Sequence, residues 1–227
     1  MALHIYEDLE QGTEEWLNAR CGIITASVVG QLITAKTLKV ASNDTSRALT
    51  AHLAAERITG YVEPTTTTRD MERGTLDEPY ARDKYSEHYQ PATEIGFMVR
   101  DDWGYKIGYS PDGLVGDGGL IEIKSRRQKK HLATILADEV PLENMAQIQT
   151  GLLVSEREWC DYVSYCGGMP LYVKRVLPDP DWHAVILEAV GGFEMAAATM
   201  IDAYEMRTAN NPPTERIDHF LEMDISL

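Results

Sequence analysis

Apolar residues recur at helical spacing in several stretches of the chain, and this period predicts helices. The clearest stretch is 45–60, where Leu49, Leu53 and Ile58 share one face and Gly60 is the stop signal. Further helices are predicted over these ranges: 13–20, 25–33, 77–89, 127–138, 142–155 and 180–210. Helical patterns thus occupy both ends of the chain.

Runs of β-branched and aromatic residues between turn signals predict strands. They cover 93–100, 105–110 and 119–125, and a second pair, 158–166 and 170–177, is joined at Gly167-Gly168. Helices, three strands, helices, two strands and a last helix predict an α/β fold: a single domain with a central mixed β-sheet flanked by helices. We assign residues 1–210 to this domain and 211–227 to a C-terminal tail.

A proline modifies the pattern of 69–89, a segment that is helical only after Asp77. Pro79 is expected in the first turn of that helix, where its missing N–H costs nothing. Glu78 would then be a first-turn glutamate, a position that the helix dipole favours.

The net charge of the chain bears on whether it can bind nucleic acids. Its 227 residues include 36 acidic and 21 basic ones, a formal net charge of −15, which argues against broad affinity for nucleic acids. The segment 124–131, "KSRRQKKH", nevertheless places five Lys or Arg in eight positions. It is either the solvated start of a helix or a local contact for phosphates.

Cysteines and apolar runs indicate the compartment. The three cysteines, Cys21, Cys160 and Cys166, are scattered and form no CxxC pair. We therefore expect a reduced, cytoplasmic protein without a structural zinc or a disulfide framework. No secretory signal is visible at the N-terminus, and no apolar run approaches the roughly 20 residues of a membrane span, so no membrane association is expected.

The segment 110–125, "SPDGLVGDGGLIEIKS", holds the strongest candidate for chemistry. Side chains alternate along a strand, so Glu122 and Lys124 point to one face while Ile121 and Ile123 enter the core. The glycine-rich turn lets the chain double back and bring Asp112 beside Glu122. Two close carboxylates repel each other unless a cation lies between them, and Mg²⁺ prefers such hard oxygen ligands. Lys124 cannot be a ligand, but it can hold the attacking water or offset charge that develops at phosphorus.

This segment has other interpretations besides a metal site. A β-hairpin with an exposed acidic face explains most chance matches to D…ExK. A serine hydrolase is disfavoured, because "GYSPD" departs from G-x-S-x-G and precedes a turn rather than a helix. An EF-hand loop fails, because its ligand positions hold Leu114, Gly116 and Ile123. The six histidines are far apart, and packing or surface roles are expected for them.

The pattern "PD…EIK" resembles the signature of the PD-(D/E)XK nuclease superfamily. The chain around it is similar to the lambda-type phage exonucleases, also called YqaJ-like viral recombinases. Four segments carry the resemblance in the order and spacing of that family: "EEWLNARCGIITAS" (14–27), "ERGTLDEPYARDKY" (72–85), "YSPDGLVGDGGLIEIKS" (109–125) and "MAQIQTGLLV" (145–154). It therefore spans roughly residues 10 to 180.

The resemblance implies a role for each motif residue. Asp112 and Glu122 match the metal-binding carboxylates of the family, and the backbone carbonyl of Ile123 matches a further metal ligand. Lys124 matches the catalytic lysine. Glu78 falls where a helix of the family supplies another acidic group, although the favourable first-turn position is the alternative explanation for it.

A second set of positions matches the residues with which the family grips the phosphate at the recessing 5′ end: Arg20, Ser27, Ser110 and Gln149. Ser27 is expected near a helix start, where backbone N–H groups favour an anion, and Arg20 can bind phosphate bidentately. Arg69 matches a basic residue that contacts DNA. Each of them, taken alone, equally suits a helix cap or the surface.

The resemblance implies an Mg²⁺-dependent 5′→3′ exonuclease that digests linear double-stranded DNA and leaves 3′ single strands for a single-strand annealing protein. One or two ions per site are expected, with Mn²⁺ as a substitute. It also implies a phage or prophage protein in the cytoplasm of a bacterial host. A ring-shaped homotrimer threaded by DNA is implied as well, and the basic residues of 124–131 would face its channel.

Three alternatives stay open. The first is an endonuclease of the same superfamily. The second is a CRISPR-associated relative, many of which hold an iron–sulfur cluster on four cysteines, whereas this chain has three. The third is a catalytically idle DNA-binding protein that assists recombination.

Overall fold

The computed structural model describes residues 2–64 and 66–217. Its helices are α1 (Glu14–Arg20), the 3₁₀ helix η1 (Val29–Leu32), α2 (Asp44–Thr59), α3 (Arg69–His88), α4 (Gln128–Ala137), α5 (Leu142–Ser155) and α6 (Pro180–Thr208). Its strands are β1 (Leu3–Tyr6), β2 (Ile24–Thr25), β3 (Ile33–Thr34), β4 (Lys39–Val40), β5 (Ala92–Thr93), β6 (Phe97–Arg100), β7 (Ile107–Tyr109), β8 (Gly113–Val115), β9 (Gly119–Ser125), β10 (Trp159–Tyr165) and β11 (Tyr172–Val176).

The strands confirm the mixed α/β fold, but they form separate sheets rather than one central sheet. A five-stranded sheet has the order β11-β10-β9-β8-β5, in which β9 and β10 are parallel and the other pairs antiparallel. A four-stranded sheet has the order β1-β6-β7-β2, and β3 and β4 form a small hairpin. The described part of the chain therefore carries its strands in two main sheets with a two-stranded hairpin beside them.

The strand predicted over 93–100 divides between the two main sheets. Its first residue, Thr93, belongs to β5, and its last four residues form β6. The chain changes sheets at Gly96, where a Cβ would collide with the backbone oxygens of Tyr6 and Leu9. A glycine is required there because the backbone after β1 comes so close.

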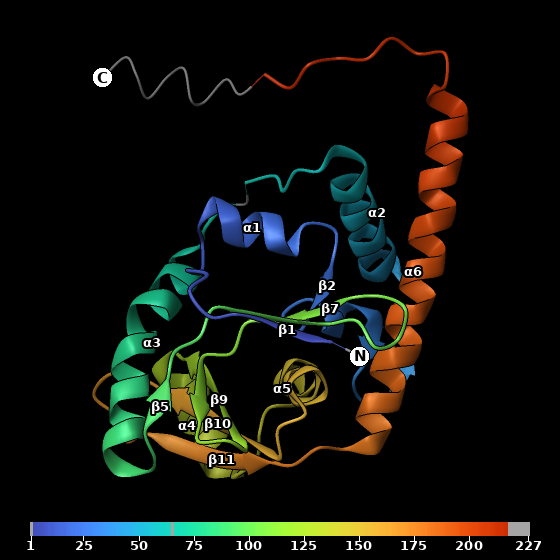
Figure 1. Cartoon of the computed structure of the whole chain (residues 1–227). Helices are drawn as coiled ribbons and strands as arrows, with labels where there is room; N and C mark the ends of the chain where they lie inside the picture. The colour runs from blue at the N-terminus through green and yellow to red at the C-terminus, as the bar shows by residue number, and fades with distance from the viewer. Residues whose placement is uncertain (1, 65, 218–227) are drawn as a thin grey trace, which may run out of the picture.

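Two helices cover opposite faces of the five-stranded sheet (Figure 1). On one face α3 packs Ala81 and Tyr85 against Ile121, Ile123 and Val163. On the other face α5 contributes to the main core together with α2, α6 and the four-stranded sheet. The site-bearing strand β9 thus lies between α3 and α5.

The helix predicted over 25–33 is wrong. Ile24 and Thr25 form β2, parallel to β7, and the N–H of Ala26 donates to the carbonyl of Gly108 at 2.8 Å. Only the four residues of η1 are helical in this range. Pairing with β7 takes up the backbone groups that a helix would have used.

The expected start of α3 is also wrong. The helix begins at Arg69, capped by the side chain of Thr68, and Pro79 lies inside it on the exposed side. Both halves are tied to the sheet, because Arg73 donates to Ser125 at 3.1 Å and Arg82 donates to the backbone of Asp112 at 2.7 Å. These contacts and the buried side chains hold the helix together across the proline.

The remaining predicted helices and strands are confirmed. A capping box between Asn43 and Ser46 starts α2, and Gly60 ends it in a left-handed conformation. Helices α4 and α5 and the pair β10–β11 fall in the predicted ranges. The division between domain and tail at residue 210 stays a prediction, and residues 218–227 of that tail lie outside the described residues.

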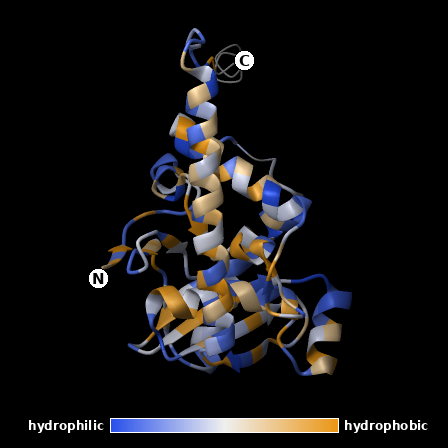
Figure 2. Cartoon of the chain, turned by 90° about the vertical axis from the view of Figure 1, so that its right-hand side faces the viewer, coloured by the Kyte–Doolittle hydropathy of each residue, from blue (hydrophilic) through white to orange (hydrophobic). Residues whose placement is uncertain are grey.

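Helix α6 was not expected to resemble a membrane span, yet it is long and apolar enough to cross one by length and composition. Its first half contributes buried residues to the core, among them Trp182, Ile186 and Phe193. Its second half extends beyond the body, and apolar residues continue along it (Figure 2). The packing of the first half is that of a core helix in a globular domain.

Candidate active site

The motif predicted to be catalytic is built on the hairpin β8–β9. Gly113 lies opposite Ile121 in the antiparallel pair, so the chain doubles back as predicted. Asp112 comes directly before β8, and its Oδ2 accepts a hydrogen bond from the N–H of Ile123 at 2.6 Å. The hairpin thereby fixes the aspartate beside the middle of β9.

Glu122 and Lys124 lie on the same face of β9, as strand alternation predicts. The Nζ of Lys124 donates to Oε1 of Glu122 at 2.6 Å. Glu122 is fully buried, and its Oε2 has no hydrogen-bond partner among the described residues. An unpaired carboxylate oxygen in such a place is costly unless a cation or another donor reaches it.

The charges of these three residues are coupled. Burial raises the pKa of Asp112 to about 7, and the nearby Glu122 adds to this, while Lys124 acts in the opposite direction. Burial alone would lower the pKa of Lys124, but Glu122 and Asp112 raise it above its usual value. Lys124 therefore stays cationic, and a further positive charge close to Asp112 would favour the ionised form of that carboxyl.

Glu78 faces this cluster from α3. Its pKa is raised to about 7 by burial and then by the charge of Asp112, against the effect of Arg82. Its Oε1 accepts a hydrogen bond from Nη2 of Arg82 at 2.5 Å. The glutamate is thus coupled to Asp112, although it lies inside α3 and not in a first turn.

Arg82 is a site residue that sequence analysis missed. It also donates from Nε to the backbone oxygen of Asp112 at 2.7 Å and from Nη1 to Glu94 at 2.8 Å. The spacing of four between Glu78 and Arg82 was the available signal, because such residues are neighbours on one helix face. The sequence gives no signal for the contact of Arg82 with the backbone oxygen of Asp112, in the loop before β8.

Asp112 and Glu122 are the residues that could hold a metal ion. No cluster of three or more His, Cys, Asp or Glu side chains in 2–64 and 66–217 is arranged to hold an ion. The two carboxylates of Asp112 and Glu122, the free Oε2 of Glu122 and the raised pKa of Asp112 nevertheless fit a hard divalent cation. Glu78 is paired with Arg82 and would have to turn from it to contribute.

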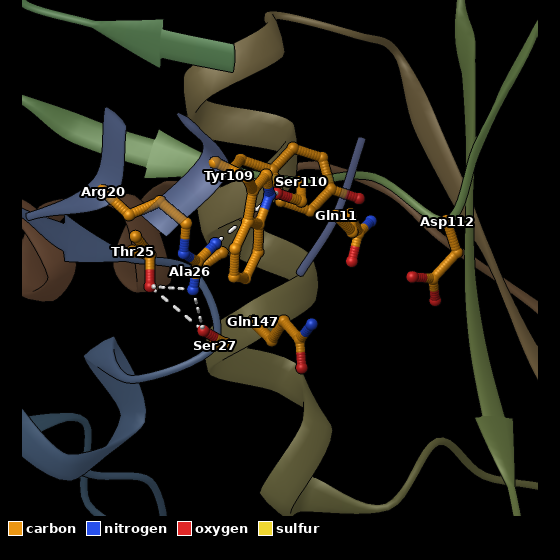
Figure 3. A pocket seen from close by; sticks show the side chains of 10 residues that line it. Gln11, Arg20, Thr25, Ala26, Ser27, Tyr109, Ser110, Asp112 and Gln147 are labelled. Carbon is orange, nitrogen blue, oxygen red and sulfur yellow. Dashed lines mark hydrogen bonds between the residues drawn. The ribbon is translucent and has the colours of Figure 1, made fainter. Parts of the chain in front are cut away.

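A cavity of about 160 Å³ opens beside Asp112 (Figure 3). Three of the predicted phosphate-gripping residues line it: Arg20 at the end of α1, Ser27 after β2 and Ser110 after β7. The other lining residues are Gln11, Trp16, Thr25, Ala26, Tyr109, Asp112 and Gln147. The cavity therefore joins the predicted phosphate site to Asp112, the aspartate predicted to be catalytic.

Arg20 is placed to bind an anion. Its guanidinium lies 3.9 Å from the ring centroid of Trp16 and makes long hydrogen bonds of 3.3–3.4 Å to Ser27, Thr25 and Ser110. Burial lowers its pKa to about 10, and within the described residues no carboxylate forms an ion pair with it. An arginine that is fixed in position and bonded only to hydroxyl groups can donate its N–H groups to a phosphate.

Gln149 does not belong to this cavity. Its side chain is fully buried, donates to the carbonyl of Leu177 at 2.9 Å and accepts from the N–H of Asp179 at 2.9 Å. Gln147 lines the cavity instead. Two positions along a helix differ by about 200°, so the two glutamines face opposite sides of α5.

One further expectation needs correction, and another stays a prediction. Ser27 lines the cavity, but it precedes a 3₁₀ helix of four residues capped by Val28, and so gains no helix N-terminus. Arg69 is exposed in the first turn of α3, apart from the residues that line the cavity, and its contact with DNA stays a prediction.

The basic segment 124–131 flanks the site, and several of its cations have acidic or polar partners. Arg127 pairs with Asp70 at 2.9 Å, Lys130 pairs with Glu143, and Arg126 donates to Asn144 at 2.7 Å. These partners belong to α3 and α5, the two helices beside β9. Whether the segment faces a channel stays a prediction.

The hairpin with Asp112, Glu122 and Lys124 beside a helix glutamate is the arrangement of a PD-(D/E)XK nuclease. A family model described as the YqaJ-like viral recombinase domain matches residues 15–158, more than half of the chain. No curated protein matches the sequence. The chain belongs to the YqaJ-like viral recombinase family, the lambda-type exonucleases, and membership suggests dependence on a divalent metal.

Solved structures agree with this assignment. The alkaline exonuclease LHK-Exo from Laribacter hongkongensis is 33% identical, with a TM-score of 0.78, over 88% of this chain and 100% of that one. The same values hold for LHK-Exo in complex with dAMP. A phage-related exonuclease from Haemophilus somnus 129PT shares the fold, with a TM-score of 0.63 at 14% identity, over 80% of this chain and 96% of that one.

Proposed function

We propose that this protein is an Mg²⁺-dependent exonuclease that digests linear double-stranded DNA from the 5′ end and leaves 3′ single-stranded overhangs for phage-type recombination. One observation carries the proposal: a single cavity is lined at one end by Arg20 and its hydroxyl partners and at the other by Asp112. A terminal phosphate bound at Arg20 would place a phosphodiester of the same strand near the carboxylates. A nuclease that cuts within a closed strand does not require a binding site for a terminal phosphate.

The residues of the chain have separate roles in binding and catalysis. Arg20, Ser27 and Ser110 hold the terminal phosphate, and Gln147 takes the place assigned to Gln149 from the sequence. Lys124 keeps its proton, orients the attacking water and offsets the charge that develops at phosphorus. Arg82 holds the loop of Asp112 against α3 through its 2.7 Å hydrogen bond to the backbone oxygen.

Asp112, Glu122 and the backbone carbonyl of Ile123 would hold the metal, with Glu78 as a further acidic group. One or two Mg²⁺ ions, with Mn²⁺ as a substitute, would supply there the positive charge that polarises the scissile phosphate and activates water. The unpaired Oε2 of Glu122 supports this assignment.

The wider setting is proposed on family membership. A homotrimeric ring threaded by DNA would allow an acidic exterior while the basic residues of 124–131 face the channel. A single-strand annealing protein would take up the 3′ strand, in the cytoplasm of a bacterial host. Residues 1–210 would form the nuclease domain.

The proposal is tested on two DNA substrates. The purified protein is incubated with Mg²⁺ and 5′-phosphorylated linear duplex DNA labelled at either end, or with closed circular DNA. Asp112→Ala is the control and EDTA the blank. Loss of the linear DNA alone, with the 5′ label released first, is expected for the wild type. Cleavage of the circle would indicate an endonuclease, and an inert protein in both Mg²⁺ and Mn²⁺ would indicate an idle DNA-binding role.

A further inference from the structure

Tyr109 has a buried hydroxyl that packing does not explain. It ends β7 and lines the cavity beside Asp112, and only 1% of the residue is exposed. Its Oη has no hydrogen-bond partner in the part of the chain that the structure describes, and the same holds for Oε2 of Glu122. A buried hydroxyl without a partner destabilises the folded protein, so a phenylalanine would be the more favourable core residue.

The ring of Tyr109 is firmly held. It packs under α5 at Gly151, where a Cβ would come within 2.6 Å of Cζ of the tyrosine ring. The glycine lets the helix approach the ring directly, and any larger residue would displace it. The hydroxyl is therefore fixed in place.

The hydroxyl lies next to the catalytic carboxylates. Figure 3 shows the phenol oxygen on the side of the ring that faces Asp112. Burial raises the pKa of Tyr109 well above its usual value, and the charge of Glu122 raises it further. The phenol thus keeps its proton and reaches from the four-stranded sheet toward a carboxylate of the five-stranded sheet.

We propose that Tyr109 is a positioning residue whose hydroxyl donates a hydrogen bond to Oε2 of Glu122 and fixes this carboxylate in the orientation that a metal site requires. The proposal rests on the nuclease function proposed above. Lys124 already holds Oε1 at 2.6 Å, so Glu122 is oriented from both of its oxygens. Each carboxylate oxygen has two lone pairs, and Oε2 can accept from Tyr109 while its other lone pair faces a cation. Partners of this kind typically contribute tenfold to a hundredfold in metal affinity or activity.

The chain offers a matched control in Tyr162. This tyrosine is also fully buried with an unpaired hydroxyl, and it lies directly opposite Glu122 on β10, but it does not line the cavity. Tyr109→Phe and Tyr162→Phe each remove one buried hydroxyl and keep the ring. The two variants therefore differ in whether the residue that loses its hydroxyl lines the cavity, and hardly at all in packing.

The experiment measures kcat and KM on 5′-phosphorylated linear duplex DNA, Mn²⁺ affinity by electron paramagnetic resonance, and Tm. Tyr109→Phe is expected to lower kcat about tenfold to a hundredfold and to weaken Mn²⁺ binding, with KM for DNA within about twofold of the wild type. Its Tm should stay level or rise, because an unpaired hydroxyl has been removed. Tyr162→Phe should keep the kcat and Mn²⁺ affinity of the wild type.

Three results would overturn the proposal: full activity with unchanged Mn²⁺ affinity in Tyr109→Phe, a lowered Tm with unchanged Mn²⁺ affinity, or an equal loss of Mn²⁺ affinity in Tyr162→Phe. The second would assign Tyr109 to packing, and the third would point to a general effect of buried hydroxyls. If the wild type leaves DNA intact, the proposed function fails, while Mn²⁺ affinity and Tm still decide the role of Tyr109.

Discussion

Arg82 donates from Nε to the backbone carbonyl oxygen of Asp112 at 2.7 Å and from Nη2 to Glu78 at 2.5 Å. One guanidinium from the middle of α3 thus holds both the loop of Asp112 and the helix residue Glu78. Only 11% of its side chain is exposed, so these contacts are made largely out of water. The position of α3 relative to β9 depends on them.

We expect Arg82→Gln and Arg82→Lys both to lower kcat/KM on linear DNA by about tenfold or more. A lysine keeps the charge but cannot donate along the two directions that the planar fork serves. The control is Glu94→Gln, which removes only the outer, exposed partner and should leave kcat/KM within about twofold. Full activity in Arg82→Lys would show that charge alone is needed.

Much of this site follows from local pattern. The period of two along "LIEIK" predicts that Glu122 and Lys124 share a face, and the 2.6 Å contact between them confirms it. The glycine-rich turn predicts the hairpin that brings Asp112 to Ile123. These features depend on neighbours in the chain, so a sequence contains them.

Features that depend on distant partners were missed. The switch between sheets at Gly96 is set by the backbone near Tyr6 and Leu9, which no local pattern reveals. Pro79 argues locally for a helix start, yet contacts with β9 on either side keep α3 continuous. Arg82 belongs to the site only through tertiary structure, because the loop before β8 packs against α3.

The raised pKa values of Asp112 and Glu78, both about 7, predict how stability depends on pH without metal. The unfolded carboxyls titrate near pH 4, so their contribution is fully present below about pH 4 and is lost as pH rises through about 7. Relative to Asp112→Asn, the wild type in EDTA should lose a few degrees of Tm between about pH 5.5 and pH 8.5. Thermal unfolding of both proteins at the two pH values measures this difference.

Mg²⁺ should reverse that loss. A cation favours the ionised carboxylates, so the gain in Tm on adding Mg²⁺ should be larger at about pH 8.5 than at about pH 5.5. Asp112→Asn should show a much smaller gain at either pH. An equal gain in wild type and variant would mean that the metal stabilises the protein elsewhere.

Arg20 should determine the preference for a 5′-phosphate. Arg20→Lys loses the bidentate fork and the stacking on Trp16, so the ratio of kcat/KM for 5′-phosphorylated over 5′-hydroxyl ends should fall about tenfold or more. The rate on 5′-hydroxyl ends should change little. Arg57→Lys is the matched control, because that half-buried arginine already has Glu194 as its partner at 2.7 Å. A phosphate preference that survives Arg20→Lys would move the end-binding site away from this cavity.

Substitution of the two glutamines of α5 should have different effects, one on the preference for 5′-phosphorylated ends and the other on stability. Gln147 lines the cavity, and Gln147→Ala should weaken the preference for 5′-phosphorylated ends while Tm changes by less than a few degrees. Gln149→Ala leaves the carbonyl of Leu177 and the N–H of Asp179 unpaired, at about 1–3 kcal/mol each, so its Tm should fall by several degrees. Its phosphate preference should persist below the new Tm, because the side chain faces away from the cavity. A loss of preference in Gln149→Ala at full stability would restore the role that the sequence assigned to Gln149.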